Sequence, residues 1–368
     1  MKKVCVGIVG NGNISPIYLQ NLSQTFKDII YLKGVCDLIP ERSKTASETW
    51  NVPVIYDTMF DMFKDPEIEI VVNLTTPNQH YGVAIEALKA GKNTHSEKPM
   101  AVRREDAKEL LDLAKEKGLL VGCAPDTFMG GGVQTCRKLL DDGFIGKPIA
   151  AAAYMTCHGH ETWHPDPEFY YEVGGGPMLD MGPYYVTALV SLLGPVARLT
   201  GITKRTFPTR TITSAGKYGK VCPVEVETHQ TGIMEFKNGV IGTIVQSFDL
   251  FASEHPCIEI FGTEGTLSVP DPNCFGGPVR FARKYGGFYE IPLTHEYADN
   301  SRGVAVADMA MALRTGRKHR ANGNFTYHVL DIMLGFEDSS KSGKHYRLKS
   351  TCERPAPMPM NVITGQLD

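Results

Sequence analysis

The first third of the sequence alternates short apolar runs with amphipathic stretches, and this alternation constrains the fold more strongly than any other feature. Runs with the length and composition of buried strands lie at 4–9, 31–36, 68–74, 93–96 and 119–123. Stretches with helical periodicity separate them, at about 16–27, 40–50, 80–90 and 104–117. Strands and helices that alternate at this spacing form a parallel sheet covered on both faces. The sequence therefore predicts an α/β fold that begins with a doubly wound parallel sheet.

After about residue 145 the pattern changes to that of a second domain. Strands are expected at 149–156, 257–261 and 266–269, and helices at 178–193, 304–313 and 326–338. Two further runs, 230–236 and 240–248, flank an Asn-Gly step that is typical of a tight hairpin turn. Successive strands with flanking helices predict an α+β domain with a large, mostly antiparallel open sheet. We expect domains at 1–124 and 125–345, with a proline-rich tail at 346–368 that packs on the surface.

Composition and charge narrow the class of protein. The fractions of hydrophobic (42%) and charged (21%) residues are typical of a globular protein, and 368 residues suit two domains. A formal net charge of -3 gives no electrostatic reason to expect nucleic acid or an anionic membrane as partner. No apolar run reaches the roughly 20 residues that span a bilayer, and no signal peptide is expected. Nine scattered cysteines, among them Cys5, Cys36 and Cys123 on apolar strands, predict reduced thiols and a cytoplasmic protein.

A glycine-rich turn follows the first predicted strand and opens the first helix. Gly10 and Gly12 lie where backbone N–H groups approach a pyrophosphate at a helix N-terminus. Asp37 ends the second strand, where a carboxylate accepts both ribose hydroxyls of NAD and repels the 2′-phosphate of NADP. Arg42 keeps NADP as the alternative, because a guanidinium pairs with that phosphate or stacks on adenine. The residues of this region expected to contact NAD are Gly10, Gly12, Asn13, Ile14, Asp37 and Arg42.

Two more loops are expected at the carboxyl edge of the same sheet, where the cofactor crevice of such a fold lies. Segment 75–80 follows the third strand, and Asn78 is expected to cap a helix that starts near His80. Glu97-Lys98-Pro99 follows the next strand, and its lysine is suited to stabilise an alkoxide beside a nicotinamide, with Glu97 holding the ammonium. The residues of these loops expected to contact the cofactor are Thr75, Thr76, Pro77, Asn78, His80, Glu97 and Lys98.

Together with the later Gly174-Gly175-Gly176-Pro177-Met178-Leu179-Asp180-Met181-Gly182, these motifs resemble the glucose–fructose oxidoreductase/inositol dehydrogenase superfamily, in order from about residue 4 to 335. The resemblance implies a Rossmann domain followed by an α/β domain whose open sheet forms a homo-oligomer interface. It also implies that Lys98 and Asp180 act on a sugar hydroxyl. Tyr184 stands where many members have an acid/base histidine, which leaves Tyr184 or Lys98 to handle the proton. Cys123-Ala124-Pro125-Asp126 stands where many members of the superfamily have an Asn and an Arg. The resemblance therefore assigns no cofactor contact to this segment.

A histidine-rich loop precedes the Gly-Gly-Gly segment. Its Trp163 offers an aromatic face to the C–H side of a pyranose, and its histidines and Glu161 offer hydrogen bonds to hydroxyls. Zinc is the alternative ligand, but Gly159 and Pro165 argue against the helix that would place His160 and His164 on one face, and no metal is expected. The residues expected to contact substrate are His158, His160, Glu161, Trp163, His164, Asp180 and Arg302.

These features predict an NAD-dependent dehydrogenase that oxidises a ring hydroxyl of a sugar, glycoside or polyol, with Lys98 and Tyr184 handling the proton. A second enzyme class is a glycosidase that uses NAD transiently, oxidising and then eliminating without net NADH. A third class is a non-catalytic regulator that senses the cofactor, which the presence of Lys98, Asp180 and Tyr184 disfavours.

Overall fold

The computed structural model describes residues 2–368, and these form two compact units. The first unit contains the residues up to 134 together with 294–327 and 355–368, and the second contains 135–293 and 328–354. The domains expected at 1–124 and 125–345 follow chain order, whereas the chain of the structure returns to its first unit twice. This return depends on contacts between residues far apart in the sequence, which a reading along the chain does not reveal.

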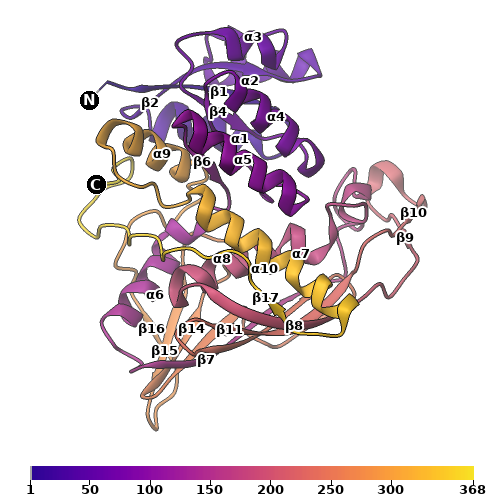
Figure 1. Ribbon diagram of the computed structural model, residues 1–368, viewed down its shortest axis with the longest axis vertical. Helices are drawn as coiled ribbons and strands as arrows, with labels where there is room; N and C mark the ends of the chain where they lie inside the picture. Colours follow the sequence, from indigo (N-terminus) through magenta and orange to yellow (C-terminus); the bar gives the residue numbers. More distant parts are fainter. Residues whose placement is uncertain (1) are drawn as a thin grey trace. The chain divides into compact units, whose positions relative to one another are not determined.

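The first unit is built on a parallel sheet of six strands in the order β3-β2-β1-β4-β5-β6, with the helices of this unit around it (Figure 1). This order reverses direction between β1 and β4, which is the arrangement of a dinucleotide-binding Rossmann sheet. The bounds of its strands are β1 Val4–Val9, β2 Ile30–Cys36, β3 Val54–Ile55, β4 Ile70–Asn73, β5 Asn93–Ser96 and β6 Val121–Cys123. Its helices are α1 Ser15–Gln20, α2 Pro40–Trp50, α3 Met59–Lys64, α4 Pro77–Lys89, α5 Arg104–Lys117 and α9 Val304–Thr315. The predicted doubly wound fold is confirmed.

Local sequence patterns predicted several of these elements with the bounds that the structure shows. Strands β1 and β5 and helices α2 and α5 begin and end at the predicted residues. Helix α1 is shorter than predicted, because a π-helical turn at Asn21–Thr25 replaces its second half. Strand β3 and helix α3 were not predicted, since a two-residue strand and a six-residue helix are too short to show a hydrophobic period.

Helix α9 belongs to the first unit because its N-terminus is bound by a residue of that unit. The Asp126 carboxylate accepts hydrogen bonds from Gly303 N (2.7 Å) and Ala305 N (3.3 Å). Asp126 is 1% exposed, and burial raises its pKa to about 6. The first N–H groups of a helix have no acceptor within the helix, and a carboxylate beside them accepts their hydrogen bonds favourably.

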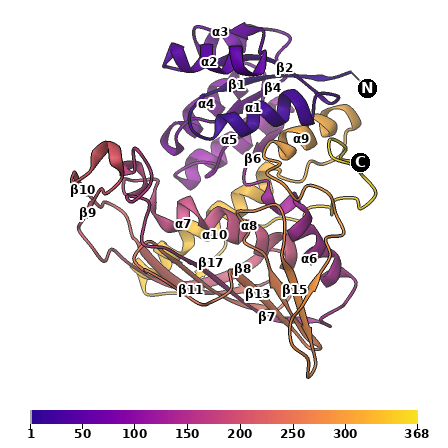
Figure 2. The ribbon, with the colours of Figure 1, turned by 180° about the vertical axis from the view of Figure 1, so that it is seen from behind.

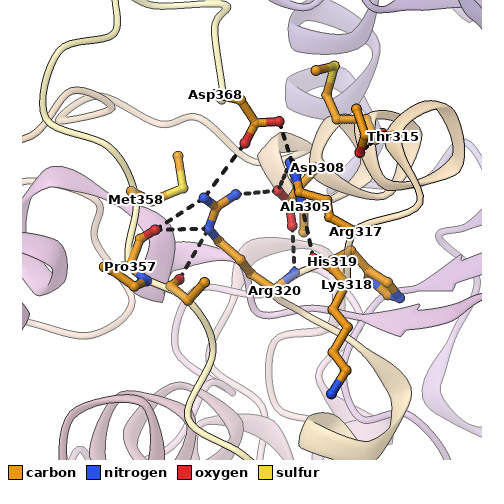
Figure 3. Close-up of polar contacts among 12 residues, drawn as sticks. Ala305, Asp308, Thr315, Arg317, Lys318, His319, Arg320, Pro357, Met358 and Asp368 are labelled. Atoms are coloured by element: carbon orange, nitrogen blue, oxygen red, sulfur yellow. Dashed lines mark hydrogen bonds and ion pairs between the residues drawn. The ribbon is translucent and has the colours of Figure 1, made fainter.

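The C-terminal segment is fixed by a buried ionic cluster of the first unit (Figure 3). Asp308, which is fully buried, forms ion pairs with Arg317 and Arg320. Arg320 also donates to the carbonyl oxygens of Ala356 and Pro357, and Arg317 pairs with Asp368. As predicted, the proline-rich segment 354–359 is neither helix nor strand. This segment is held by the cluster and by the burial of Met358, and Leu367 is buried further along the C-terminal chain.

The second unit is built on a mixed sheet of nine strands, ordered β16-β15-β14-β13-β7-β12-β11-β8-β17, in which only β7 and β12 run parallel. This confirms the predicted large, mostly antiparallel sheet. Its strands are β7 Pro148–Thr156, β8 Val196–Lys204, β11 His229–Phe236, β12 Ile241–Ser247, β13 Ile258–Gly262, β14 Gly265–Val269, β15 Val279–Arg283, β16 Tyr289–Ile291 and β17 Tyr346–Arg347. A separate ribbon pairs β9 Thr209–Thr211 with β10 Val221–Pro223.

Helices cover one face of this sheet (Figure 2). They are α7 Gly176–Asp180, α8 Gly182–Leu193 and the part of α10 Gly323–Ser342 that belongs to this unit, while α6 Gly131–Asp141 begins in the first unit and ends in the second. A side chain at Gly201 or Gly232 would collide with Phe336, so α10 lies directly on β8 and β11. Within residues 2–368 no helix combines the length and apolar character needed to cross a membrane.

The helix predicted at 178–193 is interrupted. Helix α7 ends at Asp180 and α8 starts at Gly182, with Met181 between them. Pro183 stands in the first turn of α8, where its missing N–H has no partner to lose, and it favours a new helix start over a continuing helix.

Candidate active site

The glycine turn after β1 is packed against the ends of two neighbouring strands. Gly10 has a φ of 95°, and a Cβ there would lie 2.8 Å from the Leu74 carbonyl carbon. Gly10 N donates to Cys36 O (2.8 Å), and the Asn11 side chain donates to the same oxygen (3.2 Å). A glycine is therefore required at position 10 by both the backbone angle and the space. At Gly12 a Cβ would meet nothing within 4 Å, which leaves this backbone open to a ligand.

Asp37 lies at the end of β2 beside this turn. Its carboxylate accepts hydrogen bonds from Asn11 N (2.6 Å) and Ile39 N (2.8 Å) and is half-buried. The two contacts fix the carboxylate next to the glycine turn, as a ribose-binding carboxylate requires. Arg42 is exposed on α2, and Asn13 and Ile14 lie in the turn that leads into α1.

The loop after β4 is organised by buried side chains. Asn73 is fully buried, and its Oδ1 accepts from the Thr75 hydroxyl (2.7 Å) while its Nδ2 donates to His80 O (3.0 Å). His80 is 1% exposed, with Nδ1 2.7 Å from Pro99 O and Nε2 3.0 Å from Thr75 O, and burial lowers its pKa. The expectation that Asn78 caps the helix is wrong, because α4 starts at Pro77 and Thr76 holds the capping position.

Glu97-Lys98-Pro99 follows β5 and is held from both sides. The Glu97 carboxylate accepts from the Tyr18 hydroxyl (2.7 Å) and from Lys98 N (3.0 Å), so it fixes the lysine through its backbone. His80 binds the carbonyl of Pro99. Because β1, β4 and β5 are neighbours in one parallel sheet, the glycine turn, the Thr75 loop and Lys98 all lie at its carboxyl edge.

Tyr18 and Asn73 are the site residues that the sequence analysis missed. Tyr18 is fully buried on α1 and ties that helix to Glu97, and Asn73 ends β4. A buried polar residue at the end of an otherwise apolar strand was visible in the sequence at position 73. Nothing local distinguishes Tyr18 from an ordinary core aromatic residue.

In the second unit the structure brings together His160, Trp163 and Asp180. The Nε2 atom of His160 lies 3.0 Å from Asp180 Oδ2, and Trp163 Nε1 donates to His160 Nδ1 at 3.3 Å. The imidazole also lies against the rings of Tyr170 and Phe248, with centroids 4.4 Å and 4.7 Å away. The His160 and Asp180 side chains are each 13% exposed, whereas Trp163 is 61% exposed.

Glu161, the neighbour of His160, has internal partners. Its carboxylate accepts from the Tyr171 hydroxyl and from Arg210 Nη1 (3.2 Å), and Arg210 also pairs with Asp249. Glu161 and Arg210 are 4% and 5% exposed. The Glu161 carbonyl accepts from two backbone N–H groups of the segment between β9 and β10. These contacts fasten the histidine-rich loop to the β9–β10 ribbon.

The remaining predicted substrate residues lie in different surroundings. His158 stacks on Phe251 (centroids 3.7 Å apart), and His164 is 8% exposed with Nδ1 accepting from Asp166 N (3.0 Å). Tyr184 is 7% exposed and lies on α8, whereas Asp180 is the last residue of α7. The two residues therefore do not share one continuous helix. Arg302 belongs to the first unit and donates to Asn300 Oδ1 (2.9 Å). Across residues 2–368 no three His, Cys, Asp or Glu side chains are grouped as metal ligands.

Comparison with known families assigns both units. Residues 4–124 match the oxidoreductase family with an NAD-binding Rossmann fold, and residues 133–268 match the GFO/IDH/MocA C-terminal domain. The chain belongs to the GFO/IDH/MocA family. This confirms the predicted superfamily and identifies the chain as a member of a family of NAD-dependent oxidoreductases.

Curated members of the GFO/IDH/MocA family resemble the chain over different spans. An inositol 2-dehydrogenase/D-chiro-inositol 3-dehydrogenase of Lactiplantibacillus plantarum is 34% identical over 152 residues, 39% of this chain and 41% of that protein. A myo-inositol 2-dehydrogenase of Thermotoga maritima is 22% identical over 71% of this chain and 74% of its own length. The match with the first of these relatives thus spans less than half of it.

A solved dehydrogenase structure has the same fold. Levoglucosan dehydrogenase in complex with NADH and L-sorbose superposes with a TM-score of 0.81 at 19% identity, over 95% of this chain and 99% of that one.

The residues of the GFO/IDH/MocA Rossmann unit fit NAD. Gly12 leaves open the space that a side chain would fill, and Asp37 is fixed beside it at the end of β2. The glycine turn would hold the pyrophosphate and Asp37 the adenosine ribose. The free space at Gly12 and the carboxylate at position 37 are the two observations on which this fit depends.

Proposed function

We propose that the protein oxidises a ring hydroxyl of a sugar, glycoside or polyol with NAD as the hydride acceptor. The observation that carries the proposal is the placement of Lys98 at the carboxyl end of β5, in the row of strand ends that also contains the glycine turn. An ammonium fixed there stabilises the alkoxide from which hydride leaves. The names of the relatives support the substrate class, since they include inositol, levoglucosan and D-xylose dehydrogenases.

Three residues are proposed to act on the reacting hydroxyl. Lys98 and Tyr184 donate hydrogen bonds to its oxygen, and Asp180 positions the group that takes up its proton. NAD, when bound, supplies the carbon that accepts the hydride. The oxidised substrate carbon loses a hydride and its oxygen loses a proton, so a carbonyl forms and the two electrons leave with the hydride.

The histidine-rich loop is proposed to bind the rest of the substrate. Trp163 is exposed and presents an indole face of the kind that packs on the C–H side of a pyranose. Glu161 takes a different part from the one first expected of it, because its carboxylate is buried against Tyr171 and Arg210. We assign Glu161 to holding the loop that carries His160 and Trp163.

A Lys98→Met variant tests the proposal. We expect it to retain NAD binding and to lose most of its turnover, about 10²–10³-fold in kcat, because the donor to the developing alkoxide is removed. NADH absorbance is followed over a panel of sugars, glycosides and inositols, and NAD affinity is measured by calorimetry.

The matched control is Lys108→Met, an exposed lysine on α5 that pairs with Asp112. Wild-type turnover in Lys98→Met would contradict the catalytic assignment. Glycoside cleavage without net NADH in the native enzyme would replace the dehydrogenase with the redox-elimination glycosidase.

We also propose that the uncovered face of the nine-stranded sheet associates with a second copy of the chain. Ile202, Ile233 and Ile241 point to this face, and they are 72%, 47% and 53% exposed. Large apolar side chains exposed together on one face of a sheet are a feature of interaction surfaces.

A further inference from the structure

The contacts of His160 determine which of its nitrogens carries the proton. An indole N–H only donates, so the Nδ1 atom that receives the Trp163 hydrogen bond is an acceptor. The single hydrogen of a neutral imidazole is therefore on Nε2, where it is donated to the Asp180 carboxylate. A carboxylate in this position fixes the tautomer and stabilises the imidazolium that forms when Nδ1 takes up a proton.

The surroundings of His160 restrict its imidazole to this orientation. The rings of Trp163, Tyr170 and Phe248 lie 5.4 Å, 4.4 Å and 4.7 Å from it, centroid to centroid. Behind the loop, the Glu161–Arg210 pair fastens the backbone on which His160 stands. Trp163, which donates to Nδ1, is itself 61% exposed.

The side chain types expected to handle the proton are poorly suited to accept it at neutral pH. Phenol and ammonium groups have ordinary pKa values near 10, so both donate a hydrogen bond readily but hold a proton already. Imidazole is the side chain that ordinarily changes its charge between pH 5 and 8. A histidine with an acceptor nitrogen turned toward an exposed, replaceable donor therefore meets the chemical requirement better.

We propose that His160 is the catalytic residue that accepts the substrate hydroxyl proton, with Asp180 as its positioning residue. The inference rests on the proposed function. The substrate O–H takes the place of the Trp163 N–H at Nδ1. As the C–H bond breaks and its electron pair leaves with the hydride to NAD, the O–H bond breaks, the carbonyl forms, and the proton binds Nδ1. The imidazolium is paired with Asp180 and afterwards releases the proton to water.

Other titratable groups near the His160–Asp180 pair are less suited to accept the proton. Burial lowers the pKa of His164, which disfavours the protonated form of this second histidine. Burial and the Glu161 carboxylate raise the pKa of the Tyr171 phenol well above its ordinary value. Burial also raises the pKa of the Cys157 thiol. The charged groups that remain around His160 are Asp180, Asp166 and the Glu161–Arg210–Asp249 cluster.

A fluorescence experiment tests the hydrogen bonds of His160 without any turnover. The chain has two tryptophans, so a Trp50→Phe background leaves Trp163 as the reporter. Protonation of Nδ1 breaks its hydrogen bond with the indole, and an imidazolium quenches indole emission. We expect Trp163 emission to fall on acidification of the native protein and to stay unchanged in His160→Gln.

Kinetics then test the catalytic role. We expect His160→Gln to lower kcat/KM by about 10²–10⁴-fold and to remove the acid limb of its pH profile. Tyr184→Phe should keep that limb. In Asp180→Asn we expect kcat/KM to fall as well, because Nε2 of His160 loses its charged acceptor.

Several results would overturn the assignment. A His160→Gln variant that retains the rate and the acid limb, or a Tyr184→Phe variant that loses the limb, removes His160 as acceptor while leaving the dehydrogenase proposal intact. A Trp163 titration that persists in His160→Gln does the same. Native enzyme that forms no NADH with any member of the sugar and polyol panel overturns the proposed function and this inference together.

Discussion

Gly10 and Gly12 are two residues apart in one turn, yet they are glycines for different reasons. Gly10 needs its positive φ, and its Cα faces the backbone of Leu74 and Thr75 within 3 Å of where a Cβ would be. Gly12 has free space at the same point. The fold therefore requires the first glycine, whereas it leaves room for a side chain at the second, where we expect the pyrophosphate to approach.

Alanine substitutions separate the two requirements. Gly10→Ala should destabilise the protein by roughly 1–3 kcal/mol, because a side chain at positive φ is strained and collides with the neighbouring backbone. Gly12→Ala should unfold at the same urea concentration as the native protein. It should bind NAD about tenfold more weakly, because its Cβ occupies the space expected for the pyrophosphate. Urea unfolding and calorimetric NAD binding measure the two effects. Equal unfolding midpoints for both variants would contradict this division.

At the scale of elements, the start of α9 joins a late helix to an early loop. The buried Asp126 carboxylate binds the N–H groups of Gly303 and Ala305, and burial raises its pKa to about 6. In the unfolded chain an aspartate has a pKa near 3.9. The folded state therefore prefers the protonated acid, and the stability that this preference contributes is complete below pH 4 and lost as the pH rises through 6.

An Asp126→Asn variant should remove this pH dependence while its amide oxygen keeps both hydrogen bonds. Relative to the native protein, the variant should gain about 2–3 kcal/mol between pH 4 and pH 7. Urea unfolding of both proteins across this range measures the difference. Asp126→Ala serves as the control, since it also loses the helix contact and should be less stable at every pH. A native-minus-variant difference that does not change with pH would refute the assignment to the Asp126 charge.

At the scale of the whole molecule, the exposed sheet face is the feature that the single chain leaves unexplained. The rows of this face alternate threonine and small residues with isoleucine, and the ion pair Arg198–Glu235 lies at its β8–β11 side. Apolar side chains with polar neighbours of this kind are typical of an interface between copies.

An Ile202→Asp variant should shift the protein toward monomers, because a carboxylate on each copy would have to be buried at the contact. Sedimentation velocity over a range of concentrations reads out the oligomeric state. The control is Ile363→Asp, which changes an equally exposed isoleucine (68%) in the C-terminal segment, away from the sheet. A native protein that sediments as a monomer, or an Ile202→Asp variant that sediments like the native one, would exclude this face.

The sequence by itself determined the elements with a strong period and the turns with distinctive residues. Helix α5 carries Ala107, Leu110, Leu111 and Ala114 on one face between charged ends, so its bounds follow from local pattern alone. The glycine turn, Asp37 and Lys98 were also identified locally, because strand ends in a parallel sheet meet at one edge whatever the rest of the chain does. The family followed from the order of these motifs.

Only the tertiary structure decided what the polar side chains contact. Glu161 and His160 are adjacent in the sequence, yet one is buried against Arg210 and the other turns its Nδ1 to an exposed tryptophan. Likewise the return of α9 to the first unit depends on Asp126, 177 residues before its partner Gly303. Hydrophobic periodicity is a property of neighbouring residues, whereas the partner of a buried charge is chosen by whichever donor or acceptor the folded chain brings within hydrogen-bonding distance.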